Sequence, residues 1–227
     1  VNGGRIVYTD GDGREVKDYL DHIGYLPQNF DVFPELTAYE VLQFFANLKG
    51  YKITEAEIDH LLEILNLSPQ RDMTVKTLSG GMKRRLGIAQ ALIGDPDVLL
   101  LDEPTAGLDP EERLNFKNVI RRIKGDRCVV LSTHIITDIE SLCDRILVLC
   151  DGRITAFDSC GALADVARGK VYAVESTADL ATPFHSMGPV TVDGKACEKI
   201  ISKAPLNAPA LEPTVEDGYI CFIEKLS

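Results

Sequence analysis

Three short, entirely apolar runs alternate with helix-like segments in the middle of the chain, and this alternation restricts the fold more than any other feature. The runs are Val98–Leu101, Cys128–Leu131 and Ile146–Leu149. Each is too short to form a buried helix, and each follows a helix-like pattern. Runs that are apolar at every position are typical of strands buried on both faces. The alternation therefore predicts an α/β fold with a largely parallel sheet covered by helices on both faces.

Start and stop signals delimit the helices around these strands. Thr37–Glu40 and Thr54–Glu57 are capping-box sequences placed ahead of apolar residues at helical spacing, so residues 37–67 are predicted to form two amphipathic helices. Asp151-Gly152 predicts a hairpin turn into a strand at Arg153–Phe157. Further helices are expected at about Gly80–Ile93, at Pro110–Gly125 with Asp109 as its N-cap, and near Thr137–Cys143.

The two ends of the chain have a different sequence pattern from its middle, with short strand-like runs separated by turns or prolines. The first residues predict short strands at Arg5–Tyr8 and His22–Leu26, separated by a turn at Asp10–Gly13. Beyond Gly169, prolines separate three short strand-like runs, which are Val171–Val174, Lys199–Ser202 and Tyr219–Phe222. We therefore predict one domain at 1–168, with a helical subdomain at about 30–94, and a small α+β appendage at 169–227.

Composition excludes several classes of protein. The 227 residues include 35 acidic and 24 basic side chains, a net charge of −11, which disfavours nucleic-acid binding because phosphate neutralisation needs a basic face. No apolar run approaches the ~20 residues of a membrane-spanning helix, and no secretory signal is visible. The six cysteines form no C-x-x-C pair, so free thiols in a reducing, cytosolic compartment are favoured over zinc or disulfide use.

Two patterns carry candidate chemistry. Asp102 and Glu103 follow a buried strand at its carboxyl end, where ligands bind in open α/β sheets, although two acids can also simply end a strand. Ser79-Gly80-Gly81 opens a helix: Ser79 suits an N-cap, while bare backbone N–H groups at two glycines suit phosphate. For at least two of the basic residues 83–85 we expect a solvated face. Taken alone, each pattern leaves both interpretations open.

Taken together, these segments resemble the ATP-binding cassette (ABC) family of transporter ATPases, in order and in rough spacing, over about residues 3–155. Five linked motifs in the right order are highly specific, whereas each one alone is weak. The implied fold is a P-loop NTPase-like ABC ATPase core. The matching motifs are Gln28 after Leu26-Pro27, the signature-like Leu78–Gly81, the Walker B-like Val98–Asp102 with Glu103, the D-loop-like Ala106–Asp109 and the switch-like His134 in Leu131–His134.

The resemblance implies ATP and Mg²⁺ as cofactors and gives four residues a role around them. Asp102 would serve the metal, and Gln28 would contact both Mg²⁺ and the attacking water. Glu103 would be the general base. His134 would contact the γ-phosphate, although a histidine that merely ends a strand explains the local pattern as well.

The resemblance also implies a head-to-tail dimer with a second ABC ATPase domain. Ser79, Gly80 and Gly81 would contact the γ-phosphate of the ATP held by the opposite subunit. Asp109 would cross the dimer interface, and it can be an N-cap at the same time. Met82 stands where many family members have Gln, a departure that leaves the backbone and Ser79 to bind the phosphate.

The family's phosphate-binding loop, G-x-x-x-x-G-K-[ST], does not occur in the 227 residues. The Gly-Lys pairs at Gly169-Lys170 and Gly194-Lys195 are followed by Val171 and Ala196. We therefore expect an N-terminally truncated, incomplete core that is inactive alone. We also expect exposed apolar surface and unusual association, because a sheet edge would lose its cover.

Three functions are open at this point. The first is the ATPase subunit of a membrane transporter, export-type, whose transmembrane permease subunits dock on residues 30–77 and hold it at the inner face of the cell membrane. Phe30, Phe33, Phe44 and Phe45 are candidates for that apolar surface or for the core. The second is a soluble ABC ATPase acting in translation or DNA repair. The third is a non-enzymatic regulatory module, which the retained Glu103 and His134 disfavour.

Overall fold

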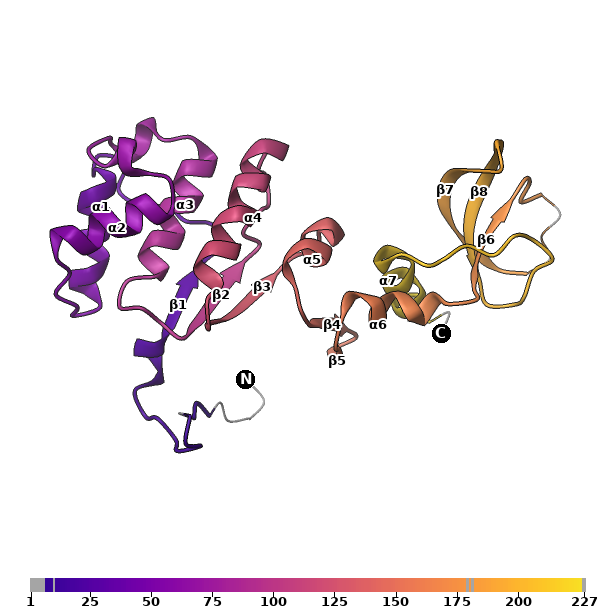
Figure 1. The fold of residues 1–227 in the computed structure, drawn as a ribbon, viewed down its shortest axis with the longest axis horizontal. Coiled ribbons are helices and arrows are strands. Elements are labelled where there is room, and N and C mark those ends of the chain that lie inside the picture. The colour runs from indigo at the N-terminus through magenta and orange to yellow at the C-terminus, as the bar shows by residue number, and fades with distance from the viewer. Residues whose placement is uncertain (1–6, 10, 179, 181, 226–227) are drawn as a thin grey trace. The chain divides into compact units, whose positions relative to one another are not determined.

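A computed structural model describes residues 7–9, 11–178, 180 and 182–225, and it divides into two compact units at residues 134 and 135 (Figure 1). The first unit contains η1 Tyr19–His22, β1 Ile23–Leu26, α1 Ala38–Leu48, α2 Glu55–Ile64, η2 Ser68–Gln70, η3 Val75–Thr77, α3 Gly80–Ala91, β2 Val98–Asp102, α4 Pro110–Lys124 and β3 Cys128–Ser132. The second contains α5 Ile136–Leu142, β4 Ile146–Cys150, β5 Arg153–Phe157, α6 Cys160–Ala164, η4 Asp165–Ala167, β6 Val171–Val174, β7 Phe184–Val192, β8 Lys195–Ser202 and α7 Val215–Ile223.

The sheet of the first unit is parallel, in the order β1-β2-β3. Leu26 of β1 lies beside Leu101 of β2, which lies beside Leu131 of β3. Helices connect consecutive strands, as a parallel sheet requires (Figure 1). The α/β prediction is therefore confirmed, and the residues that follow the three strands meet at one edge of the sheet.

The two faces of this sheet differ in burial. Leu26, Leu99 and Leu101 point to one face and are at most 2% exposed. On that face α3 packs so closely against β1 that a Cβ atom added to Gly24 would lie 2.1 Å from the carbonyl oxygen of Ala91. On the opposite face Tyr25 is 50% and Val130 46% exposed. For the described residues, the expectation of helices on both faces is therefore wrong.

The helices of the first unit begin where the caps predict. Thr37 and Thr54 each accept a hydrogen bond from the third residue of the following helix, whose Glu side chain accepts from the cap backbone, so both capping boxes are confirmed. The helix expected to end at Ile93 ends at Ala91. The described part of the predicted first strand, Val7 and Tyr8, is not a strand, and its other residues lie outside the described chain.

The second unit contains two antiparallel sheets. The predicted hairpin is confirmed as β4 and β5, and β6, β8 and β7 form a second sheet in that order. Two of the three predicted strand-like runs lie in β6 and β8. The third, Tyr219–Phe222, is wrong because it lies within the helix α7. The proposed boundary between 168 and 169 lies inside this unit and stays a prediction.

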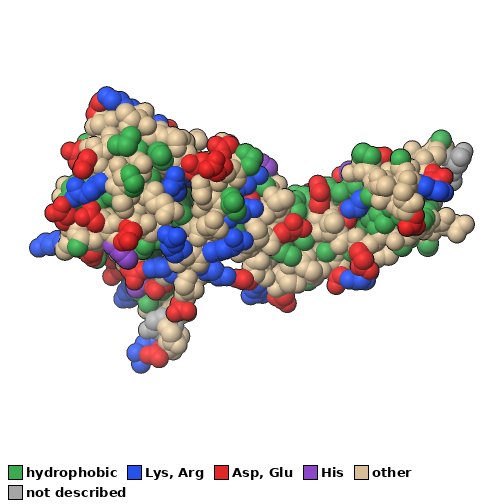
Figure 2. Space-filling view, turned by 45° about the horizontal axis from the view of Figure 1, so that its top comes forward, with side chains coloured by type: hydrophobic (Ala, Val, Ile, Leu, Met, Phe, Trp, Pro, Cys, Tyr) green, Lys and Arg blue, Asp and Glu red, His purple; other side chains and the backbone are tan. Residues whose placement is uncertain are grey.

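Hydrophobic side chains reach the surface of both units. Figure 2 shows them among acidic and basic side chains on the face in view. In the second unit, Leu147 and Leu149 of β4 are 64% and 71% exposed, and Ile154, the neighbour of Leu149 on β5, is 67% exposed. Exposed apolar surface is thus present, while the expected association stays a prediction.

Candidate functional site

Asp102 and Ser132, the last residues of β2 and β3, form the centre of the candidate site. They are partners in the parallel register, so their side chains lie next to each other. The hydroxyl of Ser132 donates to Asp102 Oδ1 at 2.6 Å and accepts from the backbone N–H of Glu103 at 2.9 Å. Ser132 thereby fixes the Asp102 side chain and the turn that follows it.

Glu103 combines an unusual backbone with a sheltered side chain. Its φ angle is +44°, in the left-handed region that non-glycine residues seldom adopt. Its Oε1 lies 2.9 Å from His134 Nδ1, and its side chain is 20% exposed against 74% for His134. Its Oε2 is buried and has no hydrogen-bond partner among the described residues. Because a buried acceptor without a partner is costly, this oxygen is suited to receive a proton or a hydrogen bond from a ligand or water.

Arg84 connects the loop after β1 with the turn after β2. Its guanidinium donates to the carbonyl oxygens of Gln28, at 2.6 Å, and Glu103, at 2.5 Å. The Gln28 side chain is exposed at the same edge of the sheet as Asp102. The expectation of a solvated basic face is wrong here, because Arg84 is 8% and Arg85 7% exposed. Residues 86–91 are all buried and, apart from Gln90, small or apolar, which is the signal that this helix has no wide polar face.

The other predicted residues begin two helices. Ser79 accepts from the N–H of Met82 at 3.1 Å and caps α3, and Asp109 accepts from the N–H of Glu112 at 2.8 Å and caps α4. Both N-cap predictions are therefore confirmed. Within the part of the chain that the structure describes, neither Ser79 nor Asp109 hydrogen bonds to Asp102 or Glu103, so no hydrogen bond joins the two groups of residues directly.

The two glycines at the start of α3 differ in their surroundings. A Cβ atom added to Gly80 would have no atom within 4 Å, so the backbone there is open to a ligand. A Cβ atom added to Gly81 would lie 2.2 Å from Glu112 Oε2 on α4. Gly80 therefore leaves space at the surface, while Gly81 permits close packing between α3 and α4.

The donor set at the edge of the sheet fits Mg²⁺ bound together with a phosphate ligand. No group of three or more His, Cys, Asp or Glu side chains that could hold a metal occurs among the described residues. Mg²⁺, however, is commonly held by one or two carboxylates with waters and substrate phosphates. Asp102 supplies one such carboxylate, since Ser132 engages its Oδ1 atom alone. The site thus suits a metal that arrives with a nucleotide better than a metal held by protein alone.

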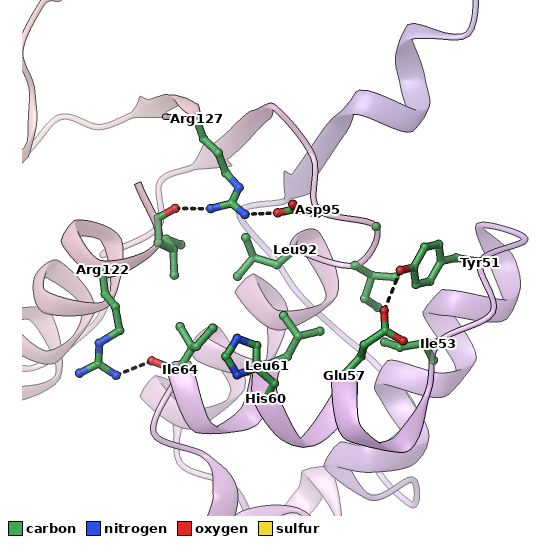
Figure 3. A pocket seen from close by; sticks show the side chains of 13 residues that line it. Tyr51, Ile53, Glu57, His60, Leu61, Ile64, Leu92, Asp95, Arg122 and Arg127 are labelled. Carbon is green, nitrogen blue, oxygen red and sulfur yellow. Dashed lines mark hydrogen bonds and ion pairs between the residues drawn. The ribbon is translucent and has the colours of Figure 1, made fainter. Parts of the chain in front are cut away.

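A pocket of about 330 Å³ lies elsewhere in the first unit, between α2, the end of α3 and α4 (Figure 3). Its floor is apolar, and its charged rim is engaged: Arg127 pairs with Asp95, and Glu57 accepts from the hydroxyl of Tyr51 at 2.8 Å. None of the predicted site residues is among those that line it. The candidate site is therefore the edge of the sheet and not this pocket.

A parallel sheet with carboxylates directly after its strands agrees with the fold of an ABC ATPase. A family model described as ABC transporter matches residues 2–106, and these residues belong to that family. The matched segment contains Gln28, Ser79–Gly81, Asp102 and Glu103, while Asp109 and His134 lie beyond it. The family implies an ABC ATPase fold and ATP binding.

Curated relatives extend the similarity. The chain is 38% identical over 144 residues to the uncharacterized ABC transporter ATP-binding protein YhcH of Bacillus subtilis, covering 62% of this chain and 47% of that protein. It is 40% identical over 151 residues to the mouse ABC-type organic anion transporter ABCA8B, covering 65% of this chain and 9% of the transporter. It is 42% identical over 134 residues to the mouse phospholipid-transporting ATPase ABCA3, covering 58% and 8%. The chain thus spans half or less of the length of each of these relatives. Among the described residues, no helix is both long and apolar enough to span a membrane.

Proposed function

We propose that this chain forms part of the ATP-hydrolysing subunit of an ABC membrane transporter, which couples hydrolysis in a head-to-tail dimer to substrate export. The observation that carries the proposal is the unpartnered, buried Oε2 of Glu103, beside His134 and Asp102 at the edge of the sheet. The names of the relatives, two of which are transporters, support the same class of function.

In the proposed site, each residue has a role that its contacts suit. Glu103 accepts the proton of the attacking water through its unpartnered oxygen, and His134 holds the other carboxylate oxygen and faces the γ-phosphate. Asp102, oriented by Ser132, would be the metal ligand. Gln28 follows β1 at the same edge of the sheet and would offer its side-chain amide to the metal and the attacking water. Mg²⁺, when bound with ATP, neutralises charge that develops on the phosphate oxygens.

The start of α3 acts on a second ATPase domain in this proposal. Ser79 and Gly80 are exposed at the N-terminus of α3, and Gly81 is closely packed there. Backbone N–H groups in the first turn of a helix have no partner within the helix and favour an anion. These three residues contact the γ-phosphate of the ATP held by the opposite domain, and Asp109 lies at the interface between the two.

A cluster of phenylalanine rings is the proposed docking surface for the transmembrane permease. The rings of Phe33 and Phe44 meet edge to face at 5.5 Å, and Phe44 meets Phe45 at 5.6 Å. Phe33 is 59% and Phe44 37% exposed, so this cluster is open to a partner. Docking there would hold the chain at the cytoplasmic face of the membrane.

The experiment compares ATP hydrolysis by two proteins. One is the 227-residue chain, and the other is the same chain extended at its N-terminus by a segment that contains a G-x-x-x-x-G-K-[ST] loop. We expect activity in the extended protein alone, because the 227 residues contain no such loop to hold the triphosphate. In the extended protein, Glu103→Gln should lower kcat by about 10²–10⁴-fold because the general base is lost.

The matched control is Glu63→Gln in the last turn of α2, an exposed glutamate to which the proposal gives no role, which should leave kcat unchanged. Absence of hydrolysis in both proteins would favour a non-enzymatic module. Hydrolysis by the 227-residue chain itself would contradict our account of phosphate binding.

A further inference from the structure

Arg84 places all its observed hydrogen bonds on the backbone of two loops at the edge of the sheet. Nη1 donates to the carbonyl oxygens of Pro27 at 3.1 Å and Gln28 at 2.6 Å, in the loop after β1. Nη2 donates to that of Glu103 at 2.5 Å, and Nε to that of Pro104 at 2.9 Å, in the turn after β2. One planar group thus holds the backbone of two residues assigned to the site.

These contacts are specific to an arginine. The guanidinium presents its N–H groups in a rigid fork, whereas a lysine ammonium is a single point on a flexible stem. Arg84 is 8% exposed, and burial lowers the pKa of its guanidinium while Asp102 and Glu103 act in the opposite direction. Arginine nevertheless stays protonated in proteins, so the four carbonyl oxygens receive charge-assisted hydrogen bonds.

The Glu103 backbone is held from both sides. Arg84 donates to its carbonyl oxygen and Ser132 accepts from its N–H, across a residue whose φ angle is +44°. A left-handed conformation at a non-glycine residue persists when its surroundings over-determine it. The direction of the Glu103 side chain, and with it the contact to His134, depends on this backbone conformation.

We propose that Arg84 is a positioning residue, which fixes the left-handed turn at Glu103 relative to the Gln28 loop so that the Glu103 carboxylate meets His134. The catalytic consequence of this role rests on the function proposed above. The contacts of Arg84 themselves are present without a nucleotide. Because Arg84 lies on α3, five residues after Ser79, it also ties the helix that begins at Ser79 to the catalytic turn.

Arg85 supplies a matched control on the same helix. It is 7% exposed, close to the 8% of Arg84. Its Nη1 donates to the carbonyl oxygens of Leu65, at 3.3 Å, and Asn66, at 3.1 Å, and its Nη2 lies 3.4 Å from Glu112 Oε1. Its contacts therefore stabilise α2 and α4 against α3 and avoid the loops of the site. A general effect of removing a buried arginine would appear in both residues.

The test is the ¹⁵N spectrum of the His134 ring at fixed pH in the ligand-free 227-residue chain. Arg84→Lys, Arg84→Gln, Arg85→Lys and Arg85→Gln are compared with the wild type, and Glu103→Gln gives the resonance of a His134 that has lost its carboxylate. We expect both Arg84 variants to shift Nδ1 toward the Glu103→Gln position and both Arg85 variants to retain the wild-type position.

Three outcomes overturn the proposal: an unchanged His134 resonance in folded Arg84 variants, an equal shift in the Arg85 variants, or loss of folding in both Arg84 variants while the Arg85 variants fold. In the extended protein, Arg84→Lys should lower kcat by about 10²-fold with little change in KM, because a small misplacement of the base is costly. The extended protein could fail to hydrolyse ATP while the 227-residue variants show the expected His134 shifts. That result would count against the proposed function and leave the positioning role of Arg84 standing.

Discussion

The same helix-start motif occurs in both units, in very different surroundings. In α2 the Thr54 N–H donates to Glu57 at 2.7 Å and the Glu57 N–H donates back to the Thr54 hydroxyl at 3.3 Å. In α7 the Thr214 N–H donates to Asp217 at 2.7 Å and the Asp217 N–H donates back at 3.2 Å. The local geometry is almost identical, as expected from a capping box.

Burial separates the two boxes. Asp217 is 0% exposed, and Lys199 of β8 places its Nζ 2.7 Å from the carboxylate. Glu57 lies near the surface and accepts a further hydrogen bond from the hydroxyl of Tyr51. The Asp217 box therefore connects a helix to a sheet through a buried ion pair, whereas the Glu57 box completes the end of one helix. The same four-residue pattern can thus have a local or a tertiary role.

Of the substitutions in the two capping boxes, Asp217→Ala should lower the free energy of unfolding the most. It removes the cap and leaves the Lys199 ammonium, 19% exposed, without its partner, so we expect a loss of about 3–5 kcal/mol in the free energy of unfolding. Chemical denaturation measures the loss, and hydrogen exchange should place it in α7 and β8. Glu216→Ala, at the exposed neighbouring position, should change stability little; an equal loss there would refute the tertiary role.

Thr54→Ala should have a smaller effect, confined to α2. It removes the hydroxyl that accepts from the Glu57 N–H, and a lost N-cap costs about 1 kcal/mol. Thermal and chemical unfolding measure the change, and Thr54→Ser, which keeps a hydroxyl, should restore most of it. A loss of stability as large as that of Asp217→Ala would show that the capping box of α2 also stabilises tertiary contacts.

The comparison also shows what could be predicted from the sequence. Thr54 can be identified as a cap from the sequence because regularly spaced apolar residues follow it. The cap at Thr214 is hard to identify because the residues after it include Tyr219, Ile220 and Phe222, which favour strands. The available signal was Thr214-Val215-Glu216-Asp217, a Thr with an acid three residues later. Local capping and burial against α6 outweigh strand propensity at this position.

The residues of the candidate site also fall into those that the sequence can place and one that it cannot. Asp102 and Glu103 could be placed at the edge of the sheet because they directly follow an apolar strand, and Ser79 and Asp109 because N-caps have a local pattern. Arg84 could not be placed, because its acceptors are backbone carbonyl oxygens 19 to 57 residues away in sequence. Backbone acceptors leave no pattern of side chains to read, so contacts of this kind appear only when the chain is folded.

The smallest expected effect is the pH dependence of the stability that the capping box of α2, Thr54–Glu57, contributes. Hydrogen bonds from the Thr54 backbone, the Thr54 hydroxyl and the Tyr51 hydroxyl lower the pKa of Glu57 below its ordinary value of 4.5. A carboxylate with a lowered pKa stabilises the folded state above its ordinary pKa, and this contribution disappears as the pH falls through the lowered value. Glu57→Gln keeps an acceptor without the charge, so wild type should be slightly more stable than this variant at pH 7.

Denaturation of both proteins between pH 7 and pH 3 should show the difference narrowing below about pH 4.5, where the charge that Thr54 and Tyr51 stabilise is progressively lost. Glu63→Gln, at an exposed glutamate in the last turn of the same helix, is measured in parallel as the control for replacing a surface glutamate of α2. A difference between wild type and Glu57→Gln that stays constant down to pH 3 would mean that shape, and not charge, makes this box effective. The distinction between the capping boxes of α2 and α7 would then rest on the ion pair of the buried Asp217 with Lys199 alone.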